Sequence, residues 1–316
     1  MPASFLVVGA TGNTGGGVLH HLTEALPKSD QFSQYRIIGL TRDTKGAKAQ
    51  ELAKLPRVEM IAQDWTMIDS AWLKEHEVER VFIASHNGVS HFTDESLFFN
   101  YALEAGVQYV VRISTTTTNI GPATPVFYAR NHWAIETMLE QPEFQKLKWS
   151  SLQPNVFISM FTDVAKDWVS TYKKDGIKSP YKLMLDGDTN AAPIDSSEVG
   201  LFAGKLLALE DVTPHASQKY CLNDPQNATG KQITKVIEKH AGTTVDDVTY
   251  RDTSFIEFAR SAGTPENVLP SLAKAPLRGY EGQTSVEAMP TSPAVLQIHT
   301  FQHGILDTLE TELSKA

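Results

Sequence analysis

The chain opens with a short apolar segment, a glycine-rich turn and a segment with helical periodicity, in that order. Ser4 to Val8 has the composition of a buried strand, and a helical pattern extends from Gly17 to Leu26. Between them, Gly9 permits a tight turn, Gly12 leaves room for a pyrophosphate and Gly15 allows the helix to pack closely on the sheet. This order predicts a dinucleotide-binding unit, whereas a turn that serves packing alone is the other interpretation. The predicted cofactor contacts are Gly9, Thr11, Gly12, Asn13, Thr14 and Gly15.

Apolar and helical segments continue to alternate through the first half of the chain. Strand-like runs occupy residues 35–41, 58–62, 80–84, 107–114 and 149–153, with helical patterns at 44–54, 95–105 and 127–140. This alternation predicts an α/β fold, namely a Rossmann-type doubly wound parallel sheet with a smaller C-terminal substrate-binding region. Ligands of such sheets bind at the carboxyl ends of the strands.

The second half breaks this rhythm. We expect loops at 174–192, a helix at 198–209, a strand at 218–222, a helix at 230–241 capped by Thr229, loops or a lid at 264–293 and a closing helix at 294–313. The predicted domains are therefore a dinucleotide-binding domain at 1–155, to which 194–224 returns, and a substrate-binding region at 156–193 and 225–316.

Composition and charge narrow the classes of partner. Hydrophobic residues make up 41% of the 316 residues, charged residues make up 21%, and the net charge is −9. A negative chain is a poor partner for nucleic acid, so none is expected. No apolar stretch reaches the length of a membrane span, and no secretory signal pattern is visible, so we expect a cytoplasmic protein. Its expected oligomeric state is a monomer or a homodimer. His86 and His91 lack a third ligand in any metal-binding spacing, and no metal site is predicted.

The end of the second strand bears on which nicotinamide cofactor is bound. A site specific for NAD usually places an acid there to hold the ribose 2′-hydroxyl. This chain places Arg42 there instead, with Lys45 nearby and Asp43 one position later. Because a planar guanidinium suits a 2′-phosphate, we predict that NADP(H) is the cofactor. A solvated loop arginine is the alternative interpretation.

Two further strand ends supply candidate contacts. Asp64 and Trp65 follow the third strand, where a carboxylate can accept from an adenine amino group or serve only as a turn residue. The residues after the fourth strand should run beneath the cofactor. The candidates there are Ala84, Ser85 and His86.

The fifth strand and the helix after it carry the candidate catalytic residues. Ser114 ends the strand, and Tyr128 and His132 are four residues apart on one helical face. A tyrosine hydroxyl can protonate a carbonyl oxygen as hydride arrives, and His132 can relay the proton or touch the cofactor. Ser114 is a candidate for both roles, and Glu136 can orient His132. An aromatic helix face that packs on the sheet is the alternative.

Four motifs together resemble the NmrA-like family of atypical short-chain dehydrogenases/reductases. They are the glycine turn at 9–15, Thr41-Arg42, the helix from Tyr128 to Glu136, and the segment from Leu152 to Phe157. The segment at 192–199 adds to this likeness. The resemblance implies a Rossmann fold that binds NADP(H), with Pro154, Asn155 and Phe157 lining its nicotinamide end.

The resemblance leaves three classes of function open. Some members of the family are reductases of quinones, isoflavone-type compounds or other small molecules, and others sense NADP(H) without turnover and regulate protein partners. Typical short-chain reductases carry Tyr-x-x-x-Lys, where this chain has Tyr128 and His132. We expect an NADPH-dependent oxidoreductase that reduces a carbonyl, quinone or imine of a small hydrophobic substrate in secondary metabolism. A non-catalytic redox sensor and an NADP(H)-scaffolded cyclase or isomerase are the alternatives.

Overall fold

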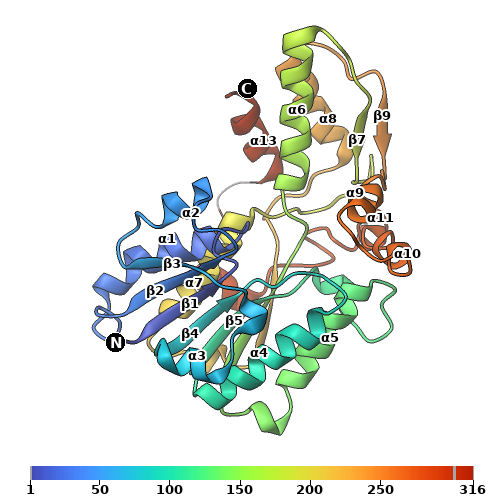
Figure 1. Ribbon diagram of the computed structural model, residues 1–316. Helices are drawn as coiled ribbons and strands as arrows, with labels where there is room; N and C mark the ends of the chain where they lie inside the picture. The colour runs from blue at the N-terminus through green and yellow to red at the C-terminus, as the bar shows by residue number, and fades with distance from the viewer. Residues whose placement is uncertain (1, 302–303, 316) are drawn as a thin grey trace. The chain divides into compact units, whose positions relative to one another are not determined.

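The apolar segments of the first half form the centre of one seven-stranded sheet (Figure 1). The strand order is β3-β2-β1-β4-β5-β6-β8, and each neighbouring pair from β3 through β6 is parallel. This order, with its crossover at β1, confirms the predicted doubly wound α/β fold. The strands are β1 Ser4–Val8, β2 Arg36–Thr41, β3 Val58–Ala62, β4 Val78–Ile83, β5 Tyr109–Ile113, β6 Lys148–Pro154 and β8 Gln218–Leu222.

The computed structural model describes residues 2–301 and 304–315, and the chain divides into two units. The first unit contains residues 1–115, 130–153 and 196–220, and the second contains 116–129, 154–195 and 221–316. This division differs from the predicted domains chiefly at 116–129. That segment joins the second unit, where the backbone N–H of Phe127 donates to Ser271 and the Asn119 amide donates to the carbonyl of Ala275.

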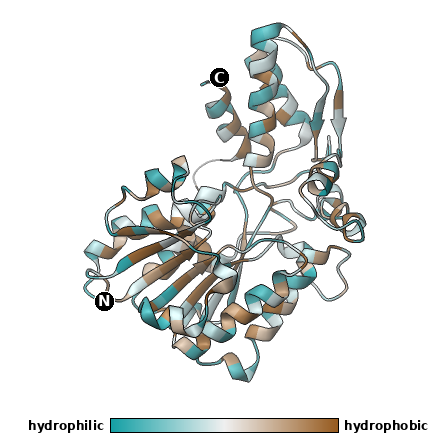
Figure 2. Ribbon diagram, viewed as in Figure 1, coloured by the Kyte–Doolittle hydropathy of each residue, from teal (hydrophilic) through white to brown (hydrophobic). Residues whose placement is uncertain are grey.

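Helices cover both faces of the sheet in the first unit. On one face, side chains of α3, α4 and α5 bury a core against alternate residues of β1, β2, β4 and β5, which Figure 2 colours as hydrophobic. Helices α1 and α7 pack together on the other face. The helix bounds are α1 Gly15–Ala25, η1 Leu26–Lys28, α2 Ala47–Leu52, η2 Trp65–Met67, α3 Ser70–Glu75, α4 His91–Ala105, α5 Phe127–Leu139, η4 Pro142–Phe144, α7 Ser196–Ala208 and η5 Thr213–His215. Residues 127–129 of α5 belong to the second unit.

The contact between α1 and α7 depends on glycine. A Cβ atom on Gly200 would lie 2.1 Å from the carbonyl oxygen of Thr14, and one on Gly17 would lie 2.7 Å from that of Ser197. The two helix backbones therefore approach as closely as glycine allows. Because Thr14 lies at the end of the glycine turn, the backbone of α7 packs directly against that turn.

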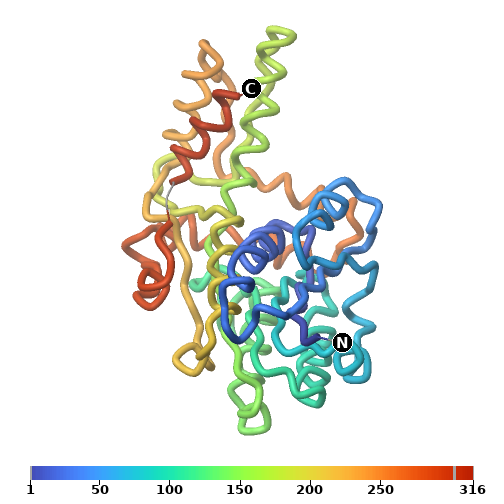
Figure 3. The backbone as a smooth tube through the Cα atoms, turned by 90° about the vertical axis from the view of Figure 1, so that its left-hand side faces the viewer, coloured from blue at the N-terminus to red at the C-terminus, as the bar shows by residue number. Residues whose placement is uncertain are grey.

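The second unit has its own core. Helices α6, α8 and α13 lie side by side, as Figures 1 and 3 show from two directions, and they bury apolar side chains together with β7. Phe161 and Trp168 of α6 are buried in this core. Thr229 caps α8, as predicted, and the structure adds a full capping box with Gln232. The elements are η3 Thr117–Asn119, α6 Ser159–Asp175, β7 Tyr181–Leu183, α8 Gly230–Ala241, β9 Val248–Tyr250, α9 Phe255–Ser261, α10 Leu269–Leu272, α11 Leu277–Tyr280, α12 Pro293–Ile298 and α13 Ile305–Leu313.

Three predicted helices are wrong in extent. Helix α4 begins at His91, four residues before its predicted start at 95. The segment 294–313 is not one helix, because the backbones of His299 and Gly304 are extended and a separate helix, α13, begins at Ile305. Helix α2 is shorter than the predicted 44–54. The backbone of Gly46 is extended, and the Asp43 carboxylate accepts a hydrogen bond from the backbone N–H of Lys45, which forms a turn before the helix. Short helices α10 and α11 lie in the region that was expected to be loops. Among the described residues, no helix has both the length and the apolar character needed to cross a membrane.

The α1–α7 contact yields a stability prediction. Gly200→Ala should lower the free energy of unfolding by about 1–3 kcal/mol, because the new methyl group overlaps a backbone carbonyl that cannot move freely. Gly16→Ala is the matched control, since the nearest atom to its Cβ would be Lys48 Cε at 3.8 Å. Urea denaturation at one pH compares the two variants. A Gly200→Ala protein as stable as the wild type would contradict the close approach.

Candidate functional site

The glycine turn after β1 has the geometry that its sequence predicts. Gly9 has a φ of +79°, and a Cβ there would lie 2.9 Å from the carbonyl oxygen of Ala84. The Gly12 N–H donates to the carbonyl of Gly9 over 2.9 Å, which closes the turn. A Cβ on Gly15 would lie 2.2 Å from the same carbonyl. Glycine is therefore required at positions 9 and 15, and the turn brings Ala84 against Gly9.

Helix α1 begins at this turn with an open N-terminus. Thr14 precedes the helix and is buried, but its side chain makes no capping hydrogen bond. The first turn of the helix contains no acidic residue, while Thr11 is partly exposed and Asn13 is exposed beside it. Uncapped backbone N–H groups at a helix N-terminus form an anion-binding position. This end of α1 is thus suited to a phosphate.

Two cations lie near the turn. Arg42 is exposed directly after β2, while the neighbouring Asp43 is held in its own loop turn by the N–H of Lys45. Lys48 on α2 donates from Nζ to the carbonyl oxygen of Gly12 over 3.0 Å. Lys48 was not among the residues predicted from the sequence. Its position six residues after Arg42, at the start of the next helix, could have indicated a second cation near the glycine turn.

The candidates after β3 and β4 meet one another. The ring centroids of Trp65 and His86 are 5.8 Å apart. Asp64 accepts the N–H of Thr66 through Oδ1 over 3.0 Å and caps η2, so its turn role is real. His86 Nδ1 accepts the N–H of Gly88, and its Nε2 faces the carboxylate of Asp94.

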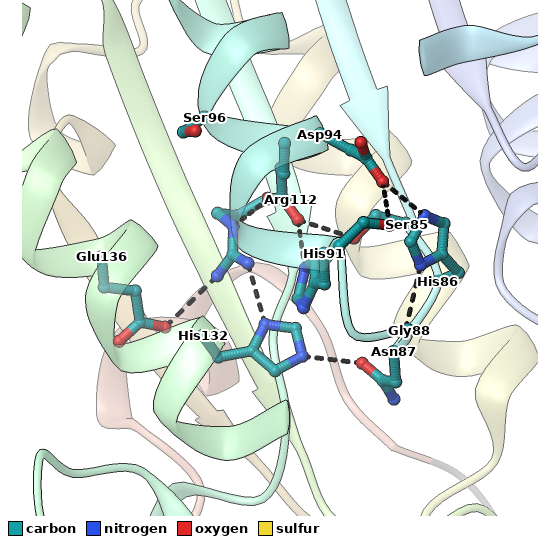
Figure 4. A network of polar contacts seen from close by, with 12 residues as sticks. Ser85, His86, Asn87, Gly88, His91, Asp94, Ser96, Arg112, His132 and Glu136 are labelled. Carbon is teal, nitrogen blue, oxygen red and sulfur yellow. Dashed lines mark hydrogen bonds and ion pairs between the residues drawn. The ribbon is translucent and has the colours of Figure 1, made fainter. Parts of the chain in front are cut away.

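A buried polar network lies behind these loops in the first unit (Figure 4). At its centre is Arg112, whose side chain is fully buried on β5. Its Nε donates to Glu95 Oε1 over 2.6 Å, and its Nη1 donates to Ser151 over 3.0 Å and lies 3.5 Å from Glu136. Arg112 and Glu95 were not among the residues predicted from the sequence. One arginine in the otherwise apolar run Tyr109–Ile113 was the signal, because a charge on a buried strand requires partners.

The network determines the protonation of His132. Arg112 Nη2 lies 2.8 Å from His132 Nδ1, and a guanidinium can only donate, so Nδ1 accepts. The ring proton is then on Nε2, which donates to Asn87 Oδ1 over 3.1 Å. Burial lowers the pKa of His132 well below its ordinary value, and the Arg112 charge and His91 lower it further. His132 is therefore neutral, with both ring nitrogens in hydrogen bonds.

Glu95 carries the negative charge on the α4 side of the network. Burial alone would raise its pKa, but the Arg112 guanidinium and the hydrogen bond with His91 outweigh burial and hold that pKa far below its ordinary value. Ser85 donates to Glu95 Oε2 over 2.6 Å and lies 3.0 Å from His91 Nε2. The Ser85 side chain is thus directed into the network.

Glu136 has a different partner from the one expected. Its carboxylate accepts from Ser151 over 2.6 Å and from Gln153 over 3.0 Å and faces Arg112. It acts on His132 through Arg112. Lys219 Nζ lies 3.9 Å from its other oxygen.

Ser114 directly follows β5, and its buried hydroxyl has no hydrogen-bond partner among the described residues. A buried unpaired hydroxyl at the carboxyl end of a parallel sheet is available to a ligand. Tyr128 is half-buried near the start of α5, with its ring 5.7 Å from that of Phe127. Tyr128 and His132 lie four residues apart on that helix, and the boundary between the units falls between them.

The three residues that the family resemblance placed at the nicotinamide end belong to the second unit. Asn155 is buried, and its Nδ2 lies within 2.9 Å of the carbonyl oxygens of Ala192 and Thr284 and of Asn223 Oδ1. Its Oδ1 accepts the next backbone N–H, so the whole amide joins segments of the chain. Pro154 is buried beside it, and Phe157 is half-buried in a bridge to Ile194.

The neutral state of His132 predicts a pH dependence of stability. Below pH 6.5 the unfolded histidine binds a proton that the folded ring resists, so the unfolding free energy should fall as pH falls. Between pH 7.5 and 5.5 this one group contributes a loss of about 1.4 kcal/mol. Urea denaturation of His132→Gln should show a smaller loss than the wild type, while the exposed control His20→Gln keeps the full loss. Equal losses in His132→Gln and the wild type would contradict a neutral buried ring.

Comparison with solved structures shows a shared fold. Escherichia coli NADPH-dependent quinone oxidoreductase complexed with NADPH is 20% identical, with a TM-score of 0.65 over 93% of this chain and 98% of that chain. Citrobacter sp. triphenylmethane reductase complexed with NADP(H) is 21% identical, with a TM-score of 0.68 over 98% and 99%. A nucleoside-diphosphate-sugar epimerase from Staphylococcus aureus is 14% identical, with a TM-score of 0.66 over 98% and 99%.

Two comparisons by sequence bear on the family of this chain. A search of curated proteins found no significant match. The model of the NmrA-like family matches residues 2–278, which span the sheet, the glycine turn and the buried network. This chain therefore belongs to the NmrA-like family.

Proposed function

We propose that this protein is an NADP(H)-dependent reductase of a small hydrophobic molecule. The observation that carries the proposal is the strand-end edge of the first unit, where the glycine turn, the open N-terminus of α1 and exposed Arg42 occur together. The names of two similar structures, an NADPH-dependent quinone oxidoreductase and a triphenylmethane reductase, add support.

The residues present fit a phosphorylated dinucleotide. The turn and the α1 N–H groups suit a pyrophosphate, and Arg42 suits the 2′-phosphate. Lys48 can exchange its bond to the carbonyl of Gly12 for a phosphate oxygen. The unpaired hydroxyl of Ser114 is available as a further donor or acceptor. Asp64 Oδ2, Trp65 and the backbone at Ala84 to His86 remain the candidates for the rest of the cofactor.

The proposed substrate is a carbonyl, quinone or imine, and secondary metabolism is the proposed setting. NADPH supplies a hydride when it is bound. Tyr128 is the proposed proton donor to the substrate. His132 is the weaker candidate, because its only ring proton is already shared with Asn87 and its other nitrogen accepts from Arg112.

A redox sensor is the second candidate, and the state of His132 favours it. A typical short-chain reductase uses a tyrosine and a permanently charged lysine to relay a proton, whereas this chain has a neutral buried histidine at the lysine position. A sensor performs no turnover, so it would not need such a relay. The two functions are separated by NADPH oxidation assays with quinones, ketones and imines. A reductase consumes NADPH with some acceptor, while a sensor consumes it with none and binds a partner differently with NADP⁺ and NADPH. Conversion of a substrate without net NADPH consumption would instead indicate a cyclase or isomerase.

Arg42 should determine the choice of cofactor. Arg42→Ala should weaken NADPH binding by about 10- to 100-fold, which corresponds to the loss of a charge-assisted hydrogen bond, and should leave NADH binding unchanged. Calorimetry measures both affinities. Lys28→Ala removes an exposed cation on η1 as the matched control. Equal affinities of the unaltered protein for NADPH and NADH would contradict the proposal.

The proton donor is tested by Tyr128→Phe. If the hydroxyl donates the proton, kcat should fall by roughly 10²- to 10⁴-fold, while NADPH affinity should change little because the ring remains. Stopped-flow oxidation of NADPH with the best acceptor of the panel measures kcat. An unchanged kcat would show that solvent or another group supplies the proton.

A further inference from the structure

The loop after β4 offers an amide whose position is determined from inside the first unit. Asn87 is exposed, but its Oδ1 accepts from His132 Nε2 over 3.1 Å. Figure 4 shows the amide nitrogen of Asn87 on the side away from His132. Because the oxygen is engaged by a donor, the Nδ2 hydrogens are directed away from the protein interior.

Arg112 determines which atom His132 offers to Asn87. An imidazole with its proton on Nδ1 would place that N–H against a guanidinium N–H at 2.8 Å, and it would leave Nε2 without a proton for Asn87. Only the Nε2–H form satisfies both contacts. The cation in turn is held by Glu95 at 2.6 Å, so the orientation of Asn87 is linked to buried charges.

The groups around His132 keep its ring neutral. The groups that face or adjoin the ring from its neighbours are Arg112 on β5, His91 and Glu95 on α4, and Glu136 on α5. Arg112 faces the carboxylates of both Glu95 and Glu136, while exposed Lys219 lies 2.6 Å from Glu140 and 3.9 Å from Glu136. A proton on His132 would place a second positive charge in direct contact with Arg112 in a buried position, which disfavours it strongly.

The location of Asn87 points to the dinucleotide. It is three residues after Ala84, whose carbonyl oxygen lies against the Gly9 turn, and β4 is the neighbour of β1 in the sheet. We propose that Asn87 is a cofactor-contacting residue that donates from Nδ2 to a neutral sugar oxygen of NADP(H), and that His132 is the neutral positioning residue that orients it. This inference rests on the proposed cofactor.

The role differs from a proton relay. No proton leaves His132 in this arrangement, because the ring only transmits the orientation of Arg112 to the amide. Glutamine can reproduce both contacts, since its oxygen can accept from Arg112 and its nitrogen can donate to Asn87. Leucine can reproduce neither. The pair of substitutions therefore separates orientation from proton transfer.

The first test measures the ring directly. Nitrogen-15 NMR of histidine-labelled protein, with His132→Gln used to assign the signal, should show an unprotonated Nδ1 and a protonated Nε2 in His132 at pH 6 to 8, with and without NADPH. A doubly protonated ring, or a proton on Nδ1, would overturn the role of Arg112. This result does not depend on whether the protein binds NADPH.

The second test measures NADPH affinity by calorimetry. Asn87→Ala and Asn87→Asp should each weaken binding by about three- to tenfold, because both remove the Nδ2 donor, and Asn87→Asp keeps an acceptor for His132. Asn100→Ala, at an exposed position on α4, is the matched control. His132→Leu should weaken binding to the same extent as Asn87→Ala, and His132→Gln should restore most of the affinity.

The outcomes distinguish this inference from the proposed function. If the wild type binds NADPH and both Asn87 variants bind it equally well, the contact is absent and the cofactor assignment stands. If only the KM for 1,4-naphthoquinone changes, Asn87 contacts the substrate, which also overturns the inference. If the wild type binds no NADPH, the proposed function fails together with the Asn87 contact, and the NMR measurement still decides the state of His132.

Discussion

The buried guanidinium of Arg112 is the interaction on which the organisation of the first unit depends. A permanent charge inside a sheet must be paired, and breaking such a pair typically costs 3–5 kcal/mol. The partners come from three other elements: Glu95 from α4, His132 and Glu136 from α5, and Ser151 from β6. One side chain thereby joins four elements and determines the state of the loop that follows β4.

This arrangement determines what His132, at the position of the usual lysine, can do. The nearest permanent cation to the ring lies on β5 instead of on the next turn of α5, and two carboxylates already compensate it. His132 therefore cannot serve as a cation that lowers the pKa of Tyr128. The chain retains the strand-end architecture of its fold but differs inside it, and in the proposed reductase Tyr128 must donate its proton without a permanent cation one turn further along α5.

Local rules predicted much of the fold. The glycine spacing gave the turn after β1, the alternation of apolar and helical segments gave the sheet, and Thr229 marked the start of α8. Long-range contacts were not visible in the sequence. The sequence around Gly304 predicted a continuous helix, but the helix is interrupted there. The segment 116–129 belongs to the second unit because it forms hydrogen bonds with Ser271 and Ala275, about 150 residues away.

The candidate site shows the same division. Arg42 and the glycines follow from position after a strand, and their contacts with a cofactor remain predictions. The role of Arg112 depends on Glu95 and Glu136, which lie 17 residues before it and 24 residues after it, so no spacing within one element could reveal it. The family pattern places Asn155 at the nicotinamide end, which stays a prediction, while the hydrogen bonds of its amide to Ala192, Asn223 and Thr284 depend on distant segments.

A crystal structure of the protein with NADPH is the most direct test of the account. We expect the pyrophosphate at the N-terminus of α1, the 2′-phosphate within hydrogen-bond distance of Arg42, and Asn87 Nδ2 in contact with a sugar oxygen while its Oδ1 keeps the bond to His132. A dinucleotide bound elsewhere, or one bound with Arg42 turned away from the phosphate, would contradict the account.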